Sequence, residues 1–568
     1  MKKDNLLIAS KTSRIHPLLA AVVFFGSFIL YWQTAARYPG WVDAAWILSS
    51  ARNLELGVWA NVHSLFNILG FLWLRLFHGT DPHYALTLFC SLLGSLTVLF
   101  VYLTGVALTV DPVASLLTSV ALTLSLSLWW HSTTIEVYTL NTLLIAFFMF
   151  SVFKAYRLRK PGFLYAAFFT AGLGISNHVL MALYVFAFFA VLLPLSAKRF
   201  HLKVRNIIFL ILVYLAGATL YAVLFIIRWS TIYRGMGPGF GGFFESFAAT
   251  FNYAMGGPFL DSMFTSGLES RQKLFWRINY IFLILLNFPS PALIFIILGF
   301  PAFWKRKEIR PVFLFYIVGI TAQILWSANY FIWDMYAFAL PVYVMLAVPL
   351  VLGTHNFLVK RKTLVWAPVL LVLFLVPVFL YPSFARWPNR EKTVDRYMSM
   401  YPESERTGGI WDPAEYIFNP VKRSYDKAAM FCEGVLKILP TGAAYWDDES
   451  KGAYPMEYYY QDIMGRRLDV DINRIFGLIM NDEDAEQHAR TMLDQLRKNQ
   501  RVFLSGIVEP QREILNRLYV TLSKEASLEQ VRDMDRATFI ENFPDYRIEE
   551  VPLVDDGSMV IYQLKKRS

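Results

Sequence analysis

The residues best suited to proton transfer are two carboxylates in an otherwise apolar part of the chain. Asp43 follows the first apolar run and directly precedes an amphipathic stretch. It could cap a helix or take a proton from an acceptor hydroxyl, and the two roles are compatible. Glu136 begins the run Glu-Val-Tyr-Thr-Leu-Asn, where it could act chemically or favour a helix N-terminus. We therefore treat Asp43 and Glu136 as candidate catalytic residues.

The candidate binding residues are polar or aromatic side chains that lie where apolar runs begin or end. Structural explanations exist for them. Trp and Tyr favour the membrane interface, and an interhelical hydrogen bond would account for an Asn-His pair. Ionisable groups near a membrane are nonetheless costly and usually have a purpose. The candidates at these positions are His63, His131, Tyr138, Asn141, Asn177, His178 and Asp334.

Two arginines precede a glycine-rich stretch at 235–242. Arg228 and Arg234 could bind an anion at the membrane surface, because the guanidinium group suits phosphate. Glycines allow a backbone to approach a ligand or to hinge, although a flexible linker is the slightly favoured interpretation. The stretch is not a phosphate-binding loop of the Walker type, since no Lys-Ser/Thr follows it.

A metal site is the alternative use of the acidic and imidazole groups. Their spacings match no known ligand pattern, so we expect no metal and no other cofactor, with a divalent metal kept as the alternative. The side chains that could take part are Asp43, His63, His131, Glu136 and His178.

The composition indicates which part of the chain lies in a membrane, and so where these residues lie. The chain has 568 residues, of which 56% are hydrophobic and 17% charged, against roughly 25% charged residues in soluble proteins. A mean hydropathy above zero excludes a soluble globular enzyme, a disordered chain and a fibrous chain. Residues 1–381 hold 27 basic and 11 acidic residues, whereas 382–568 hold 26 and 32. The sequence therefore predicts a membrane domain over 1–381 and a soluble domain over 382–568.

The membrane domain is expected to cross the bilayer about eleven times, since a spanning helix needs about 20 apolar residues. Long outer loops at 37–83 and 228–276 separate some of the spans. The first loop contains an amphipathic helix from Ala44 to Val58, which we expect to lie in the interface plane. The expected spans are 16–36, 84–106, 113–131, 139–156, 162–178, 179–196, 206–227, 277–300, 311–327, 335–357 and 363–381.

The basic residues decide the orientation. A short apolar segment, 63–77, would make twelve spans, but the N-terminal basic cluster would then oppose the later ones. With eleven spans all clusters lie on one side, as cytoplasmic loops require; the later clusters are 154–160, 198–205, 305–310 and 360–362. The segment 63–77 is then a half-buried or re-entrant helix, the N-terminus is cytoplasmic, and the C-terminal domain is extracytoplasmic.

The C-terminal domain alternates apolar strands with helical patterns, which is typical of an α/β domain. Strands are expected at 443–446, 501–504 and 559–562, and helices at 485–498 and 511–521.

With these residues in place, the sequence resembles the GT-C membrane glycosyltransferases, and among them the family related to protein O-mannosyltransferases. The family has an Asp after the first span, a His-containing turn before a short apolar helix and a Glu-Val-Tyr-x-Leu-Asn motif. An Asn-His pair and an Asp before a later helix follow. Over roughly residues 15–345 these features match Asp43, His63, Glu136–Asn141, Asn177-His178 and Asp334.

Two positions depart from the family pattern. Trp46 stands where the family commonly has a second carboxylate, and Ser64-Leu65-Phe66-Asn67 replaces a proline-rich turn. Either Glu55 or Glu136 supplies the second carboxylate, or the donor or acceptor chemistry differs.

The resemblance implies a polytopic α-helical membrane protein of GT-C type with a C-terminal extracytoplasmic α/β domain. It implies a hexosyltransferase that moves a sugar, such as mannose, from a polyprenyl-phosphate carrier to a hydroxyl of a protein or glycan at the outer face. In this account Asp43 is the base and Glu136 orients the sugar or assists Asp43. His63, His131 or Arg228 would stabilise the departing phosphate.

Besides the lipid-linked sugar and its acceptor, the expected partners are the membrane lipids. Nucleic acid is not expected, because the basic residues form short clusters between apolar runs.

A transporter or flippase of a lipid-linked saccharide is the main alternative function, although the polar residues gather on one side and no inverted repeat is visible. A membrane anchor that presents the C-terminal domain as a binding module is the third possibility.

Overall fold

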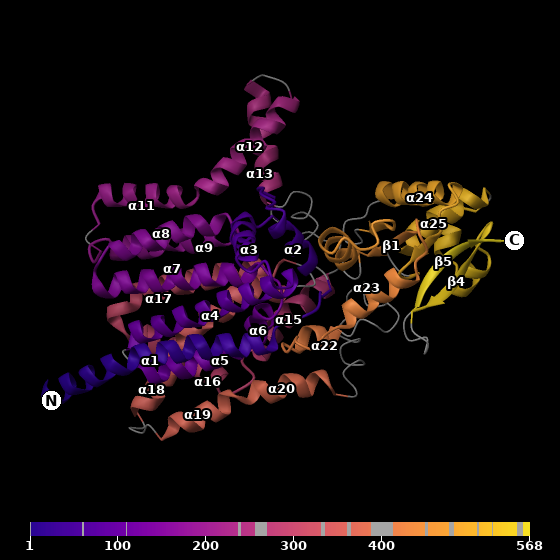
Figure 1. Ribbon diagram of the computed structural model, residues 1–568. Coiled ribbons are helices and arrows are strands. Elements are labelled where there is room, and N and C mark those ends of the chain that lie inside the picture. Colours follow the sequence, from indigo (N-terminus) through magenta and orange to yellow (C-terminus); the bar gives the residue numbers. More distant parts are fainter. Residues whose placement is uncertain are drawn as a thin grey trace. The chain divides into compact units, whose positions relative to one another are not determined.

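The chain forms two compact units in a computed structural model (Figure 1). Unit 1 comprises Met1–Ala35, Ser50–Ala385 and Phe418–Lys422; unit 2 comprises Ala36–Ser49, Arg386–Ile417 and Arg423–Ser568. The expected boundary after residue 381 thus lies near Ala385, and the segment after the first helix groups with unit 2. The structure describes residues 2–567 except 42, 60–61, 110, 201, 237–239, 256–269, 331–334, 361–364, 388–412, 449–452, 476–481, 508–510, 525 and 554–559.

The described part of unit 1 is built of helices, and α2 begins in unit 2 and ends in unit 1. Their bounds are α1 Lys2–Thr34, α2 Ala44–Arg52, α3 Ser64–Leu76, α4 Pro82–Thr109, α5 Pro112–Thr123, α6 Leu126–Ser132, α7 Tyr138–Leu158, α8 Gly162–Ile175, α9 Met181–Ala187, η1 Phe188–Leu192, α10 Leu193–Ser196, α11 Val204–Gly217, α12 Thr219–Met236, α13 Phe240–Met255, α15 Ser270–Asn287, α16 Ala292–Lys305, η2 Lys307–Ile309, α17 Arg310–Ser327, α18 Met335–Lys360, α19 Trp366–Phe374 and α20 Val376–Ala385.

Fewer helices qualify as membrane spans than the eleven expected. Within the described residues, six helices are long and apolar enough, and three bent pairs bring the number to at most nine. The expected span 277–300 is broken between α15 and α16 with a bend of 103°, where Pro289 and Pro291 interrupt helical hydrogen bonding. The expected span 206–227 bends by 64° between α11 and α12. A multi-pass membrane domain is confirmed, but the number of spans is not.

The stretch 228–276 is more regular than a flexible loop. Its described part consists of the end of α12, the whole of α13 and the start of α15. The linker interpretation of 235–242 is wrong for the described residues 235–236 and 240–242, which are helical. The physical reason is aromatic packing, since Trp229 on α12 contacts Phe243 and Phe247 on α13 at ring-centroid distances of 4.8 and 5.6 Å.

Close backbone contacts hold the helices of unit 1 together. Helix α4 packs on α7, α7 on α8, and α8 on α11, which run side by side in Figure 1. A Cβ atom at Gly172 would overlap the backbone of α11, and one at Gly299 would overlap the carbonyl group of Pro349 on α18. Small residues allow helices in a membrane to approach to this degree. Helix α18 is buried along its whole apolar length, as its all-round hydrophobicity requires.

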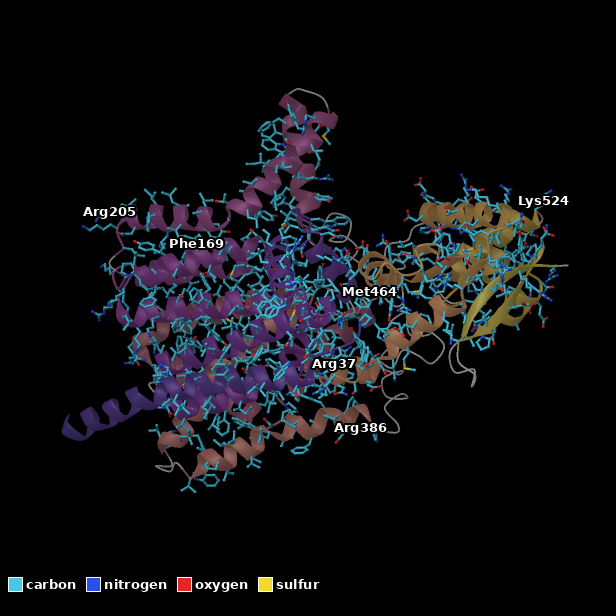
Figure 2. The ribbon with its side chains drawn as sticks, viewed as in Figure 1. Arg37, Phe169, Arg205, Arg386, Met464 and Lys524 are labelled. Atoms are coloured by element: carbon cyan, nitrogen blue, oxygen red, sulfur yellow. The ribbon has the colours of Figure 1, made fainter. Side chains whose placement is uncertain are left out.

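The basic loops of unit 1 gather at one end. The Arg157 guanidinium donates to the Ala107 carbonyl group, and Arg306 Nη1 donates to Leu108 O at 3.1 Å. Arg199 Nε donates to Tyr156 O at 3.1 Å. Arg205, labelled in Figure 2, lies at the same end. The clusters 154–160, 198–205 and 305–310 therefore share one end of the helices, as the orientation argument requires.

Unit 2 contains a five-stranded mixed sheet of order β2-β1-β3-β5-β4. Strands β1, β2 and β3 are parallel, and β5 pairs antiparallel with β3 and β4. The expected α/β fold and its three strands and two helices are confirmed. The elements are α22 Pro413–Phe418, α23 Lys427–Ile438, β1 Ala444–Asp448, η4 Pro455–Ile463, β2 Asp471–Ile475, α24 Asp482–Arg497, β3 Val502–Leu504, α25 Gln511–Ser523, α26 Leu528–Arg532, α27 Arg536–Glu541, β4 Tyr546–Pro552 and β5 Val560–Lys566.

Candidate functional site

Five rings from distant parts of unit 1 form a cluster with Tyr138 at its centre. The other members, which we call the ring cluster together with Tyr138, are His63, His131, His178 and Phe338. The Tyr138 ring lies 6.4 Å from His63, 5.7 Å from His178 and 5.9 Å from His131, measured between centroids. Phe338 completes the cluster at 5.3 Å from Tyr138 and 5.8 Å from His178. Four of the predicted binding residues therefore meet in one place.

Local backbone contacts bring the rings together. His63 immediately precedes α3, and Leu65 N donates to Ser176 O at 3.1 Å, which ties the start of α3 to the end of α8. His63 Nδ1 lies 2.5 Å from Asn177 O. Asn177 Nδ2 donates to Val137 O at 3.4 Å, beside the first turn of α7. The Asn177-His178 turn therefore joins α3 to α7.

The hydrogen bonds fix the tautomers of two neutral imidazoles. Asn177 O can only accept, so the proton of neutral His63 lies on Nδ1 and its Nε2 is an acceptor. Leu180 N donates to His178 Nδ1 at 3.3 Å, so His178 carries its proton on Nε2 and is a donor there. The two rings stack at 5.8 Å with an angle of 24°. The pair therefore presents a hydrogen-bond acceptor, His63 Nε2, beside a hydrogen-bond donor, His178 Nε2.

Burial keeps both imidazoles uncharged. It lowers the pKa of His63 to about 4, although the hydrogen bond to Asn177 offsets part of the shift. Burial lowers the pKa of His178 to about 3, and the neighbouring His63 adds to the shift. A pKa below 5 means that the histidine is neutral at pH 7, so the pair binds by hydrogen bonding and ring contact.

Four members of the ring cluster, His63, Tyr138, His178 and Phe338, line a cavity of about 70 Å³ that opens to solvent. The described lining residues include no Asp, Glu, Lys or Arg, so this part of the lining is polar and aromatic without a fixed charge. Its residues are Val58, Trp59, Val62, His63, Tyr138, Ile175, Ser176, Asn177, His178, Val179, Tyr221, Ala254, Met255, Trp326, Tyr330 and Phe338.

A cation lies next to this lining. The Arg228 guanidinium stacks on the Tyr253 ring at 4.3 Å, and Tyr253 contacts the cavity residue Trp59 at 5.3 Å between ring centroids. Arg228 Nε is buried and has no hydrogen-bond partner among the described residues. The arrangement leaves a donor free for an anion near the cavity.

Asp43 belongs to unit 2, and its contacts are given within that unit. It directly precedes α2, and Ile47 N donates to Asp43 O at 2.8 Å, which is the backbone arrangement of an N-cap. The described residues provide no hydrogen bond to its carboxylate. Burial raises the pKa of Asp43 to about 6. Such a carboxyl group is half protonated near pH 6 and can accept a proton at pH 7.

Three other predicted residues do not line the cavity: His131, which belongs to the ring cluster, and Glu136 and Asn141, which lie near Tyr138 in the sequence. His131 is fully buried on α6, and its Nδ1 lies 2.6 Å from Ser127 O. The backbone of Glu136 contacts Cys90 Sγ at 3.5 Å. Asn141 is fully buried on α7, and neither of its amide atoms has a partner among the described residues.

The remaining predicted residues are not gathered into the site. Arg234 is exposed, and its Nε donates to Ser230 O of its own helix at 3.2 Å. Asp334 lies outside the described residues. Among the residues that the structure describes, no three His, Cys, Asp or Glu side chains come together as a metal site. The metal alternative therefore has no ligand set in the described part of the chain.

Sequence reasoning did not identify most of the aromatic lining. Trp59, Tyr221, Trp326 and Phe338 come from four separate segments, and only the fold brings them to one cavity. The available signal was weak, because Trp and Tyr at the ends of apolar runs also mark an ordinary membrane interface.

Residues 61–201 match the family described as the Protein O-mannosyl-transferase TMEM260 N-terminal domain. This stretch contains His63, Tyr138 and His178, three of the four ring-cluster residues that line the cavity. The resemblance to GT-C glycosyltransferases is confirmed. No curated protein matches the chain in sequence.

Solved structures extend the likeness to the GT-C fold of the whole chain. ArnT from Cupriavidus metallidurans, solved with undecaprenyl phosphate, aligns over 97% of each chain with 12% identity and a TM-score of 0.50. The oligosaccharyltransferase of Archaeoglobus fulgidus aligns over 85% of this chain and 67% of its own, with 13% identity and a TM-score of 0.47. Arabinofuranosyltransferase AftD from Mycobacteria aligns over 96% and 40%, with 13% identity and a TM-score of 0.44. At identities this low the likeness concerns the fold alone, and the two structures with TM-scores of 0.47 and 0.44 carry no weight in the argument.

Proposed function

We propose that this protein is a hexosyltransferase that moves a sugar from a polyprenyl-phosphate carrier to a hydroxyl group of a protein or glycan. The observation that carries the proposal is the cavity around His63, Tyr138 and His178, whose described lining has no charged side chain, in a chain with a GT-C fold. Hydroxyl groups of a sugar both donate and accept hydrogen bonds, so they complement the His63 acceptor and the His178 donor. The aromatic lining suits the apolar face of a sugar ring.

The absence of charge from the described lining supports a phosphate position at Arg228. A phosphate has little to gain from uncharged imidazoles, whereas Arg228 lies near the cavity with an unpaired donor. Arginine matches phosphate geometry, so Arg228 stabilises the departing polyprenyl phosphate. In the reaction, the acceptor oxygen forms a bond to the anomeric carbon as the bond to the phosphate oxygen breaks. The acceptor proton passes to Asp43.

The proposed site faces the outer side of the membrane. Helix α7 carries Tyr138 at its first residue and Arg157 in its last turn, which separates cavity and basic end by about 30 Å. That length matches the hydrocarbon thickness of a bilayer. Because basic loops favour the cytoplasm, the cavity opens on the opposite side. The C-terminal domain is proposed to be extracytoplasmic, and the N-terminus cytoplasmic.

The test of this function is transfer by the purified protein in lipid nanodiscs. Labelled polyprenyl-phosphate mannose and an acceptor peptide rich in Ser and Thr are supplied, and the product is identified by mass spectrometry. We expect a hexose on a hydroxyl side chain, with other polyprenyl-linked sugars as comparison donors. If none of the donors is consumed, the proposal is wrong.

The comparisons give no support to the transporter alternative. In sealed liposomes, a flippase would move labelled donor to the inner leaflet without forming product. A transferase would consume the donor in the leaflet that faces its cavity.

The pH dependence of transfer follows from Asp43. A base with a raised pKa is deprotonated above that value and becomes protonated below it. We expect single-turnover rates to fall about tenfold for each pH unit below about 6. His63 and His178 add no titration between pH 5 and 8, because burial holds the pKa of each near or below 4. A rate independent of pH from 5 to 8 would argue against Asp43 as the base.

His178→Phe tests the role of the ring cluster. The substitution keeps a ring against Tyr138 and Phe338 but removes the Nε2 donor, together with the Nδ1 acceptor of Leu180 N. A neutral hydrogen bond contributes about 0.5–1.5 kcal/mol, so we expect kcat/KM for the donor to fall about 3- to 10-fold. His78→Phe, at an exposed position outside the cavity, is the matched control. Equal rates for the two variants would show that His178 does not bind the donor.

A further inference from the structure

The segment that carries Asp43 packs inside unit 2. Trp41 is 1% exposed, and its Nε1 donates to Tyr425 Oη at 2.7 Å. Its ring contacts Phe431 on α23 at 5.8 Å. Tyr416 on α22 donates its hydroxyl to Trp41 O at 3.1 Å. The side chain and the backbone of Trp41 are therefore both held by residues that lie more than 370 positions later in the sequence.

A second contact holds the segment on the other side of Asp43. Ser49 Oγ donates to Asp462 Oδ2 at 2.5 Å. Ser49 is buried on α2, and Asp462 lies in η4. The segment is thus held two residues before Asp43 and six residues after it.

Asp43 itself depends on these contacts for its position. The described residues provide no hydrogen bond to its carboxylate, and Ile47 N binds only its main-chain carbonyl group. A carboxylate without bonds of its own is oriented by the backbone on which it stands. The backbone here is fixed through Trp41 and Ser49.

We propose that the C-terminal domain positions the catalytic segment, with Trp41 and Ser49 as positioning residues that act through Asp43. The inference rests on the proposed function, in which Asp43 is the base. It gives the α22, α23 and η4 region a role in the reaction: it fixes the backbone that carries the base. A shift of about 1 Å in a catalytic group can reduce a rate about 100-fold.

The first test is Trp41→Phe in the full chain. Phenylalanine keeps the ring on Phe431 but loses the bond to Tyr425. We expect kcat for sugar transfer to fall about 10- to 100-fold, with KM for the lipid-linked donor unchanged. Trp446→Phe is the matched control, because Trp446 is equally buried and its Nε1 donates to Gln495 Oε1 at 2.9 Å. A purely structural role predicts the same kcat for both variants, and that result would overturn the inference.

A second test avoids a large buried side chain. Ser49→Ala and Asp462→Ala each remove one partner of the Ser49–Asp462 hydrogen bond. We expect each to lower kcat, and we expect the double variant to lose less than the two single effects combined, because the two residues share this contact. Wild-type kcat in both single variants would overturn the inference.

A third measurement is independent of activity. Ser49→Cys combined with Asp462→Cys is treated with a short bifunctional thiol reagent, and the peptides are examined by mass spectrometry. The peptides that are joined distinguish a cross-link between the engineered positions from one at the native Cys90 or Cys432. Absence of the cross-link would overturn the inference without bearing on the proposed function. A cross-link in the double-cysteine chain together with no sugar transfer by the wild-type chain would instead contradict the proposed function, and with it the role of these contacts in the reaction.

Discussion

Asp43→Asn is expected to lower the single-turnover rate of sugar transfer by about 10²- to 10⁴-fold, the usual contribution of a general base. The substitution leaves size and shape almost unchanged. Asparagine also caps a helix as well as aspartate does, so the start of α2 is preserved. The variant therefore separates the catalytic role of Asp43 from its structural one.

A matched control comes from a second helix start. Asp81 Oδ1 accepts a hydrogen bond from Tyr84 N at 2.9 Å at the beginning of α4, and this residue lies outside the cavity lining. Asp81→Asn is expected to keep wild-type transfer. The measurement is product formed from labelled polyprenyl-phosphate sugar with enzyme in excess. Near-wild-type transfer by Asp43→Asn would rule out its role as the base.

Gly299→Ala is expected to destabilise the membrane domain by about 3 kcal/mol or more, at the upper end for overpacking. The added Cβ would overlap the Pro349 carbonyl group, and Gly353 faces the Phe295 backbone in the same way. Backbone atoms cannot move aside by changing rotamer, so α16 and α18 have to separate. Because α18 is the most completely buried of the six long apolar helices described, the separation disturbs the centre of unit 1.

The measurement is the thermal unfolding temperature of the purified protein in one detergent. Gly26→Ala is the control, because nothing lies within 4 Å of a Cβ at Gly26 and alanine favours a helix more than glycine does. We expect Gly26→Ala to unfold at or above the wild-type temperature and Gly299→Ala well below it. Equal temperatures for the two variants would mean that the close contact of α16 with α18 is not required.

The α/β fold of the C-terminal domain was predictable from its central strands. Strands β1, β3 and β5 form the middle of the sheet and are apolar enough to stand out. Strands β2 and β4 were missed because they are the two edges. Edge strands carry charged residues that discourage pairing with other chains, and the Arg-Ile-Glu-Glu run of β4 is an example.

The bends within the expected spans were not predictable, because hydropathy alone does not reveal where a helix bends. The runs at 113–131, 206–227 and 277–300 are apolar throughout, yet each is divided in the structure. Prolines give a physical cause only in the last of them. Shorter apolar runs at 162–178 and 179–196 form helices of 14 to 16 residues, which is less than the roughly 20 needed to cross a bilayer.

The candidate site could be predicted in part from the polar residues of the sequence. Ionisable side chains are rare in the membrane domain, so His63 and His178 stood out individually. Their tautomers and their stacking could not be foreseen, because these depend on the Asn177 carbonyl group and the Leu180 amide. The burial of Asp43, which sets its pKa, likewise arises only from tertiary packing.

A structure of the protein with polyprenyl phosphate, in the presence and absence of the sugar, tests the central claim most directly. The account predicts sugar density in the cavity within hydrogen-bond distance of His63 Nε2 and His178 Nε2, and the phosphate at the Arg228 guanidinium. A phosphate or sugar bound elsewhere on the membrane domain, with only water in the cavity lined by His63, Tyr138 and His178, would contradict it.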